Sequence, residues 1–170
     1  MLILALDLGK YKTVACRYES ETGEHRFVRV ITTPFSLHDL IVDCEPDRVV
    51  FEIGSSAGWL SDLLEALEID FEVANTAHPA WRWSNTKKKT DRTDALRLAQ
   101  LSAMKQFPQV HVPKHSIRQW RALIRYRSHL VARRTQIKNR IRALLDRAGE
   151  RHAKGRHGRT ASAIQVLKSM

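Results

Sequence analysis

The amino-acid sequence predicts an α/β domain with a mixed sheet and flanking helices, followed by one long basic helix. Strand-like runs joined by short turns open the chain, and strands then alternate with helices to about residue 107. Residues 116–148 contain neither proline nor glycine, which favours a single uninterrupted helix. We therefore expect a first domain over residues 1–107, a second segment over 108–148 that carries the long basic helix, and a basic flexible tail over 149–170.

The charge of the chain divides into two halves. Residues 1–85 carry 7 Lys and Arg against 14 Asp and Glu, whereas residues 86–170 carry 22 against 4. An acidic fold followed by a strongly basic segment is typical of a protein that binds nucleic acid. We do not expect a membrane partner, because no apolar anchor, signal peptide or lipidation motif accompanies the charge. Cys16 and Cys44 lie apart without a metal-ligand pattern, which predicts reduced thiols in a cytoplasmic protein.

The first three expected strands form an antiparallel meander. Residues 2–8 are an apolar run, as in a strand buried on both faces, and residues 13–18 follow after a short turn. Residues 26–31 alternate polar and apolar side chains, as a strand with one exposed face would. Short connections between consecutive strands favour antiparallel pairing.

The next elements alternate helix and strand, which predicts parallel pairing and hence a mixed sheet. Ser36 is expected to cap a helix that ends before Pro46. Residues 48–53 are a buried strand, residues 59–67 a helix with an apolar stripe, and residues 70–74 a fifth short strand.

Two further helices are expected after the fifth strand. Residues 91–106 place apolar side chains at helical spacing, and residues 108–113 form a linker bounded by prolines. In the long helix, five apolar residues recur at spacings of seven, four, three and four, as in a coiled coil. They are Leu130, Ile137, Ile141, Leu144 and Ala148. This apolar seam predicts a homo-oligomer, either a dimer or a tetramer.

Four acidic residues are candidates for catalysis and metal binding. Asp7 and Glu52 come near the ends of expected buried strands, where an ionised carboxylate is costly unless something neutralises it. Asp91 and Asp94 are three apart, so they share one side of a helix. Carboxylate oxygens suit divalent Mg²⁺ or Mn²⁺ held against a phosphate. Each acid also has an alternative, purely structural role. Asp91 and Asp94 could mark the start of a helix, Asp7 could end its strand or form a turn, and Glu52 could form an ion pair with Lys or Arg.

Basic residues supply the candidate nucleic-acid contacts. A lysine run precedes the paired aspartates, and arginines recur along the long helix with only Asp146 to oppose them. Such a one-sided excess of positive charge indicates that this face binds a polyanion and is not only exposed to solvent. The candidates are Lys87, Lys88, Lys89, Arg118, Arg121, Arg125, Arg133, Arg140 and Arg147.

Three segments together resemble a known family. In order, they are Asp7-Leu8-Gly9-Lys10, Phe51-Glu52 and Lys89-Thr90-Asp91-Arg92-Thr93-Asp94-Ala95. They are similar to the DEDD transposases, the RuvC-like recombinases of certain bacterial insertion sequences, which are related to Piv-type DNA invertases. The resemblance runs from Met1 to about Glu150, and its last segment is the most specific.

The resemblance implies a ribonuclease H-like fold and a DEDD transposase activity that cleaves and transfers DNA strands. It also implies that Asp7, Glu52, Asp91 and Asp94 bind Mg²⁺. A structured guide RNA and a basic coiled coil that mediates oligomer contacts are further implied, in a bacterial cytoplasmic protein. Family chains are longer and carry a downstream domain with a proposed nucleophilic serine. No serine of this chain lies in a stretch that matches that domain. We therefore expect an incomplete transposase, and whether this chain is active by itself stays open.

Three alternatives stay open at this point. The chain could be a nucleic-acid-binding and oligomerisation module that is inactive alone, or a standalone RuvC-like junction nuclease with the same chemistry. It could also be an actin-like sugar or acyl kinase, whose first strand ends in a similar Asp-x-Gly turn. Such kinases need further glycine-rich phosphate loops, and the small-residue turn over residues 54–58 is the one other candidate before the helices.

Overall fold

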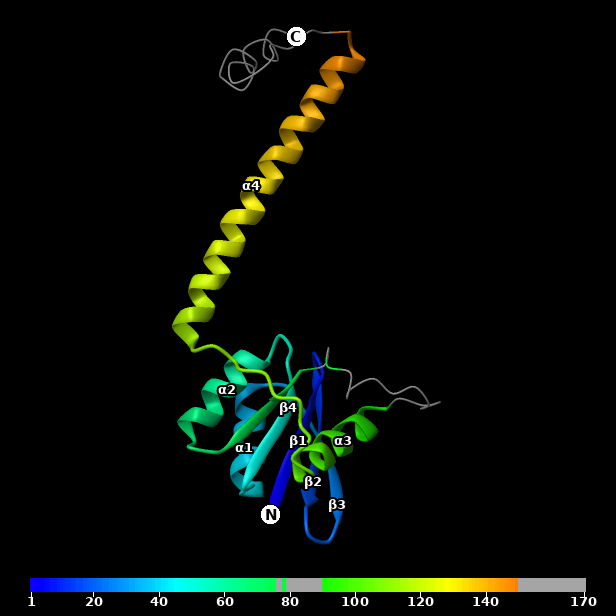
Figure 1. Ribbon diagram of the computed structural model, residues 1–170, viewed down its shortest axis with the longest axis vertical. Helices are drawn as coiled ribbons and strands as arrows, with labels where there is room; N and C mark the ends of the chain where they lie inside the picture. The colour runs from blue at the N-terminus through cyan, green and yellow to red at the C-terminus, as the bar shows by residue number, and fades with distance from the viewer. Residues whose placement is uncertain (76–77, 79–89, 150–170) are drawn as a thin grey trace. The chain divides into compact units, whose positions relative to one another are not determined.

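The computed structural model describes residues 1–75, 78 and 90–149 (Figure 1). The three lysines 87–89 and the expected tail therefore lie outside the described residues. The chain divides into two compact units, one over Met1–Arg118 and one that starts at Gln119. Each unit is considered by itself.

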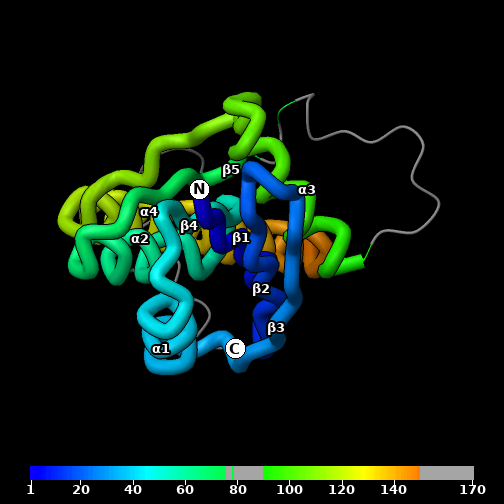
Figure 2. The backbone as a smooth tube through the Cα atoms, turned by 90° about the horizontal axis from the view of Figure 1, so that it is seen from below, coloured from blue at the N-terminus to red at the C-terminus, as the bar shows by residue number. Residues whose placement is uncertain are grey.

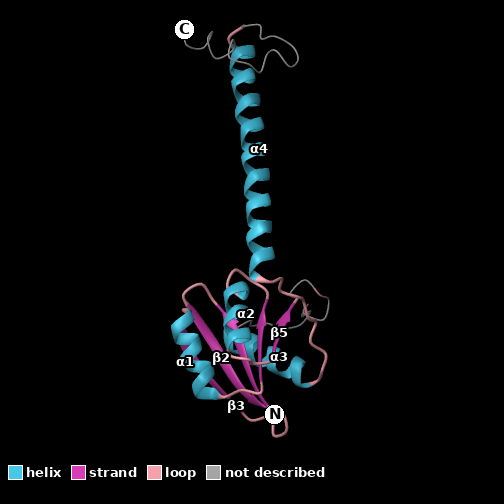
Figure 3. Cartoon of the chain, turned by 90° about the vertical axis from the view of Figure 1, so that its left-hand side faces the viewer, coloured by secondary structure: helices cyan, strands magenta, loops and turns pink. Residues whose placement is uncertain are grey.

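The first unit is built on the mixed sheet that the sequence predicts. The strands are β1 (Leu2–Leu8), β2 (Lys12–Glu19), β3 (His25–Ile31), β4 (Arg48–Glu52) and β5 (Phe71–Ala74). Their order in the sheet is β3-β2-β1-β4-β5. The first three pair antiparallel, whereas β4 is parallel to both β1 and β5. Figure 3 shows the strands of this sheet in magenta. A meander followed by parallel strands confirms the expected ribonuclease H-like arrangement.

Helices cover both faces of this sheet, with α1 and α2 on one face and α3 on the other (Figure 2). The helices of the first unit are α1 (Pro34–Cys44), α2 (Ala57–Ala66) and α3 (Asp91–Ala103). Leu37 of α1 and Leu60 of α2 pack on one side of β1 and β4. Ala95 and Leu98 of α3 pack on the other side with Ile3, Ala5 and Val50. We call that second side of the sheet the α3 face.

The start of α1 differs from the sequence-based expectation. The N-cap is Thr33, whose side chain accepts a hydrogen bond from the backbone N–H of Ser36. Pro34 therefore occupies the first helical turn, where its fixed φ is suitable and its missing N–H costs nothing. Ser36 was the wrong choice of cap because the proline belongs inside the helix rather than before it.

The residues expected to form a linker continue the edge of the sheet. The N–H of Val110 donates to the carbonyl of Val73 at 2.8 Å, and the N–H of Asn75 donates to Pro108 at 2.7 Å. Val110 and Val112 also pack against the core beneath α1 and α2. The first compact unit accordingly reaches Arg118, beyond the expected end of the domain.

The long basic helix is present as α4 (His115–Arg147), a single helix of 33 residues. None of its residues is buried in the part of the chain that the structure describes. Leu130, Ile137 and Leu144 are among its exposed apolar side chains. In the described ranges, neither α4 nor any other helix has the length and apolar character needed to cross a bilayer.

Candidate active site

Asp7 and Glu52 lie at neighbouring positions on adjacent parallel strands. Leu6 of β1 pairs with Phe51 of β4, and each acid is the next residue along its own strand. Both strands run in the same direction, so both acids lie at the carboxyl-terminal edge of the sheet. Both are half-buried. Ligand sites in α/β proteins favour this edge of a parallel pair.

Both acids belong to the α3 face. Side chains alternate between the two faces of a strand, and Ala5 of β1 and Val50 of β4 pack beneath α3. Asp7 and Glu52 follow those residues by two positions and therefore share their face. The neighbouring Leu8 packs on the opposite core, as the alternation requires.

Asp91 and Asp94 lie in the first turn of α3, the helix that covers the same face. Thr90 caps this helix by accepting a hydrogen bond from the N–H of Thr93 at 3.3 Å. Asp94 comes four residues before the buried Leu98 and is half-buried, whereas Asp91 is exposed. Positions four apart share one side of a helix, so Asp94 lies on the side of α3 that packs on the sheet.

The four acids have the donor chemistry for a hard divalent cation. Carboxylate oxygens are the ligands that Mg²⁺ and Mn²⁺ prefer in proteins. The structure places Asp7 beside Glu52, but among the described residues it gathers no group of three or more Asp, Glu, His or Cys that could hold a metal. A metal site formed by all four acids stays a prediction.

Arg97 adds a cation to the acidic turn of α3, and sequence reasoning did not single it out. Burial lowers the pKa of its guanidinium, and the negative charge of Asp94 opposes that shift. The two residues are three apart on the helix, a spacing that could have identified the pair.

The predicted nucleic-acid contacts divide into distinct groups. Lys87, Lys88 and Lys89 lie outside the described residues. On α4, one set of arginines is exposed: Arg121, Arg125, Arg133, Arg140 and Arg147. Arg118 is different, because its guanidinium pairs with Asp62 of α2 and donates to the carbonyl of Pro113 at 2.7 Å. These contacts give Arg118 a role in holding the first turn of α4 within the first unit.

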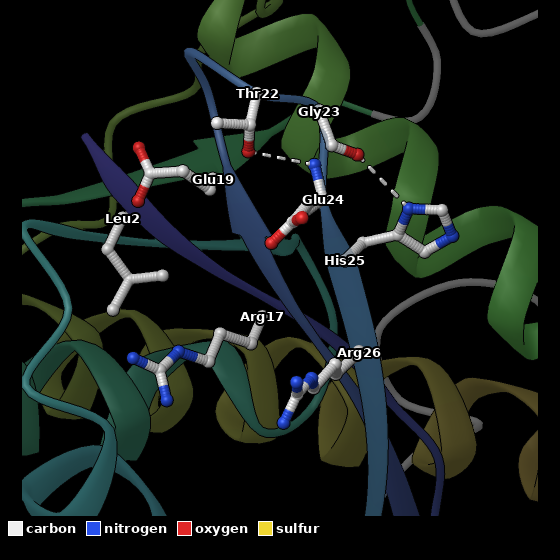
Figure 4. A pocket seen from close by; sticks show the side chains of 8 residues that line it. All are labelled: Leu2, Arg17, Glu19, Thr22, Gly23, Glu24, His25 and Arg26. Carbon is white, nitrogen blue, oxygen red and sulfur yellow. Dashed lines mark hydrogen bonds between the residues drawn. The ribbon is translucent and has the colours of Figure 1, made fainter.

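A separate hollow lies at the other end of the sheet (Figure 4). It is lined by Leu2, Arg17, Glu19, Thr22, Gly23, Glu24, His25 and Arg26. In the register of β2 and β3, Arg17 lies directly opposite Arg26. Leu2 begins β1, whereas Asp7 lies near the end of that strand, so the hollow is not part of the candidate active site.

Comparison with protein families gives a match over most of the chain. The model of the IS110-type DEDD transposases, described as "Transposase", matches residues 4–149. The chain belongs to the IS110-type DEDD transposase family. No curated protein matches the sequence.

Solved structures similar to this transposase include two of RuvC from T. thermophilus. The complex of RuvC with a Holliday junction substrate has a TM-score of 0.45 and 10% identity, and the match covers 65% of this chain and 99% of that one. A second RuvC structure has a TM-score of 0.42 and 11% identity, with 65% and 100% covered. The Fowlpox virus resolvase bound to substrate Holliday junction DNA has a TM-score of 0.38 and 12% identity, with 60% and 76% covered.

Proposed function

We propose that residues 1–107 form the Mg²⁺- or Mn²⁺-dependent catalytic domain of this transposase and cleave phosphodiester bonds of DNA. The observation that carries the proposal is the adjacency of Asp7 and Glu52 on the α3 face, beneath the helix that bears Asp91 and Asp94. Membership of the DEDD transposase family over residues 4–149 supports it. Strand transfer would in addition need the serine-bearing domain that the resemblance implies.

In this mechanism, the carboxylates of Asp7, Glu52, Asp91 and Asp94 would hold the metal ions. When bound, the ions supply positive charge that stabilises an in-line attack at phosphorus. The rigid neighbouring ends of β1 and β4 fix the first two carboxylates, and the capped first turn of α3 presents the other two. Arg97 would balance the negative charge of Asp94 and limit repulsion among the acids.

We further propose that α4 carries the contacts with a structured guide RNA and joins two or four copies of the chain. The exposed leucines and isoleucines of its seam favour a partner, because helices in proteins gain most of their stability from packing an apolar face. Its exposed arginines supply the charge for a phosphate backbone. An inactive binding module remains the second candidate, favoured by the absence of a group of three acids among the described residues.

The test compares wild type with Asp7→Asn, Glu52→Gln and Asp94→Asn, each close in size to the residue that it replaces. Mg²⁺ binding is measured by calorimetry, and cleavage of nicked and branched DNA is followed in parallel. Glu24→Gln provides a control, because Glu24 is an exposed acid in the hollow at the far end of the sheet.

We expect each active-site variant to lose Mg²⁺ affinity and at least 100-fold in cleavage rate, roughly the effect of removing a group that stabilises the transition state. DNA binding should persist and Glu24→Gln should behave as wild type. Equal Mg²⁺ binding in all variants would contradict the shared metal site. Mg²⁺ binding without cleavage by wild type would instead support the inactive module.

The seam is tested by sedimentation of wild type against Leu130→Glu, with Gln136→Glu as the matched control outside the seam. A glutamate at the seam should convert the oligomer to monomers, whereas the control should leave its mass unchanged. A monomeric wild type, with or without RNA, would rule out assembly through α4.

A further inference from the structure

Two cations of the first unit lie on the α3 face outside the candidate acids. Lys12 comes two residues before Val14, which is buried on that face. Arg29 comes two residues after Phe27, which also packs there. Strand alternation therefore places Lys12 of β2 and Arg29 of β3 on the face that holds Asp7.

The strand register aligns Arg29 with the candidate active site. Asp7 pairs with Val14, and Val14 pairs with Arg29, so the three residues form one row across β1, β2 and β3. Neighbouring strands are roughly 5 Å apart, which puts the Cα atoms of Asp7 and Arg29 about 10 Å from each other. Lys12 pairs with Ile31 near the same end of the sheet, two residues along β2 from Val14.

Neither cation has a partner among the residues that the structure describes. Lys12 and Arg29 are both exposed, and in the described part of the chain neither makes an ion pair or a side-chain hydrogen bond. Lys12 and Arg29 are diagonal neighbours on adjacent strands, close enough for their long side chains to contact one bound phosphate.

We propose that Lys12 and Arg29 form a phosphate-binding patch that holds the nucleic-acid backbone beside the phosphate to be cleaved. This inference rests on the proposed nuclease function. One strand of a DNA duplex rises by about 3.4 Å per nucleotide along the helix axis, so about 10 Å covers at most roughly three nucleotides. The patch contacts backbone phosphates within that distance of the reacting one and thereby positions the strand over Asp7 and Glu52.

Protection of a sheet edge is the competing explanation, because β3 is an edge strand. Edge strands often carry Lys or Arg, which discourage pairing with another chain. That explanation makes no distinction between the two faces. Arg26 is a matched control, since it is an exposed arginine on the same strand and on the opposite face from Phe27.

The experiment uses the full chain and a fluorescein-labelled DNA duplex. Binding is measured by anisotropy over a range of salt concentrations for wild type, Lys12→Gln, Arg29→Gln and Arg26→Gln. The slope of log K against log salt is negative, and each lost phosphate contact should reduce its magnitude by about 0.9. Single-turnover cleavage with Mg²⁺ is followed on nicked and branched DNA, and thermal unfolding checks that the variants are folded.

We expect the magnitude of the slope to fall by about 0.9 for Lys12→Gln and for Arg29→Gln, with slower cleavage. A double variant that combines Lys12→Gln and Arg29→Gln should lose about 1.8. Arg26→Gln should match wild type. Unchanged slopes in the first two variants, or an equal loss in Arg26→Gln, would overturn the patch. Reduced slopes in a protein that does not cleave DNA would support the patch while refuting the nuclease function. A wild type that does not bind DNA would overturn both.

Discussion

The stability of the first unit should depend on the carboxylate of Glu72. Its side chain is only 12% exposed and lies where β5, α3 and the following segment meet. It accepts hydrogen bonds from Ser102 Oγ at 2.5 Å and Gln109 Nε2 at 2.6 Å, and it pairs with Arg48 Nη1 at 3.3 Å. Glu72→Ala removes the acceptor for all three groups at once.

Loss of the Glu72 carboxylate affects the three donors to different extents. Ser102 is 1% exposed, so its hydroxyl would lose its acceptor in a place that water reaches poorly, at a cost of about 1–3 kcal/mol. Gln109 is exposed and can turn to water. Arg48 keeps its 2.7 Å contact with Asp70. We therefore expect Glu72→Ala to lower the free energy of unfolding by about 2–3 kcal/mol.

Urea unfolding followed by circular dichroism measures this change. Asp70→Ala is the matched control, because Asp70 pairs with the same arginine but is 60% exposed, and such a surface pair contributes about 0–1 kcal/mol. In the double variant with Ser102→Ala, no hydroxyl is left without an acceptor, so the two losses should be less than additive. A Glu72→Ala effect no larger than that of Asp70→Ala would refute the reasoning.

Three further changes have defined outcomes. Asp62→Ala removes the ion pair with Arg118 and should speed hydrogen exchange of the Arg118 amide, which donates to the carbonyl of Lys114, about fivefold, as expected for about 1 kcal/mol. Burial raises the pKa of the Cys16 thiol to about 12, so at pH 8 it stays protonated and should react with a disulfide reagent more slowly than the half-buried Cys44. Thr90→Ala removes the cap of α3 and should cost about 1 kcal/mol in urea unfolding.

Each of these expectations has a control. Glu65→Ala changes an exposed acid on the same helix as Asp62 and should leave exchange in α4 unaffected. In the urea-unfolded protein, Cys16 and Cys44 should react at similar rates. In the folded protein, a Cys16 that reacts as fast as Cys44 would contradict its burial. Thr90→Ser keeps a hydroxyl cap, so a loss as large as that of Thr90→Ala would mean that the cap is not responsible.

Local patterns were sufficient to predict the elements of the first unit and their sheet. That Asp7 and Glu52 lie together was implied by the family resemblance and not by local patterns, because β4 follows β3 along the chain but pairs with β1. The contact between Asp62 and Arg118 was not predictable, because it joins residues 56 apart and depends on how the chain returns to α2. The expected linker was likewise assigned from its prolines alone, whereas its backbone hydrogen bonds come from β5.

The relation between Asp7 and Arg29 illustrates why such contacts escape a reading of the sequence. Alternation assigns each strand two faces, but it does not say which face of one strand coincides with which face of the next. That depends on the register, which links Asp7 to Val14 and Val14 to Arg29 through two hairpins. A slip of one residue in either hairpin would move Arg29 to the opposite face. The buried Val14 and the half-buried Phe27 prevent that slip, because it would expose apolar side chains that α3 covers, so the packing beneath α3 also places Arg29 beside the acids.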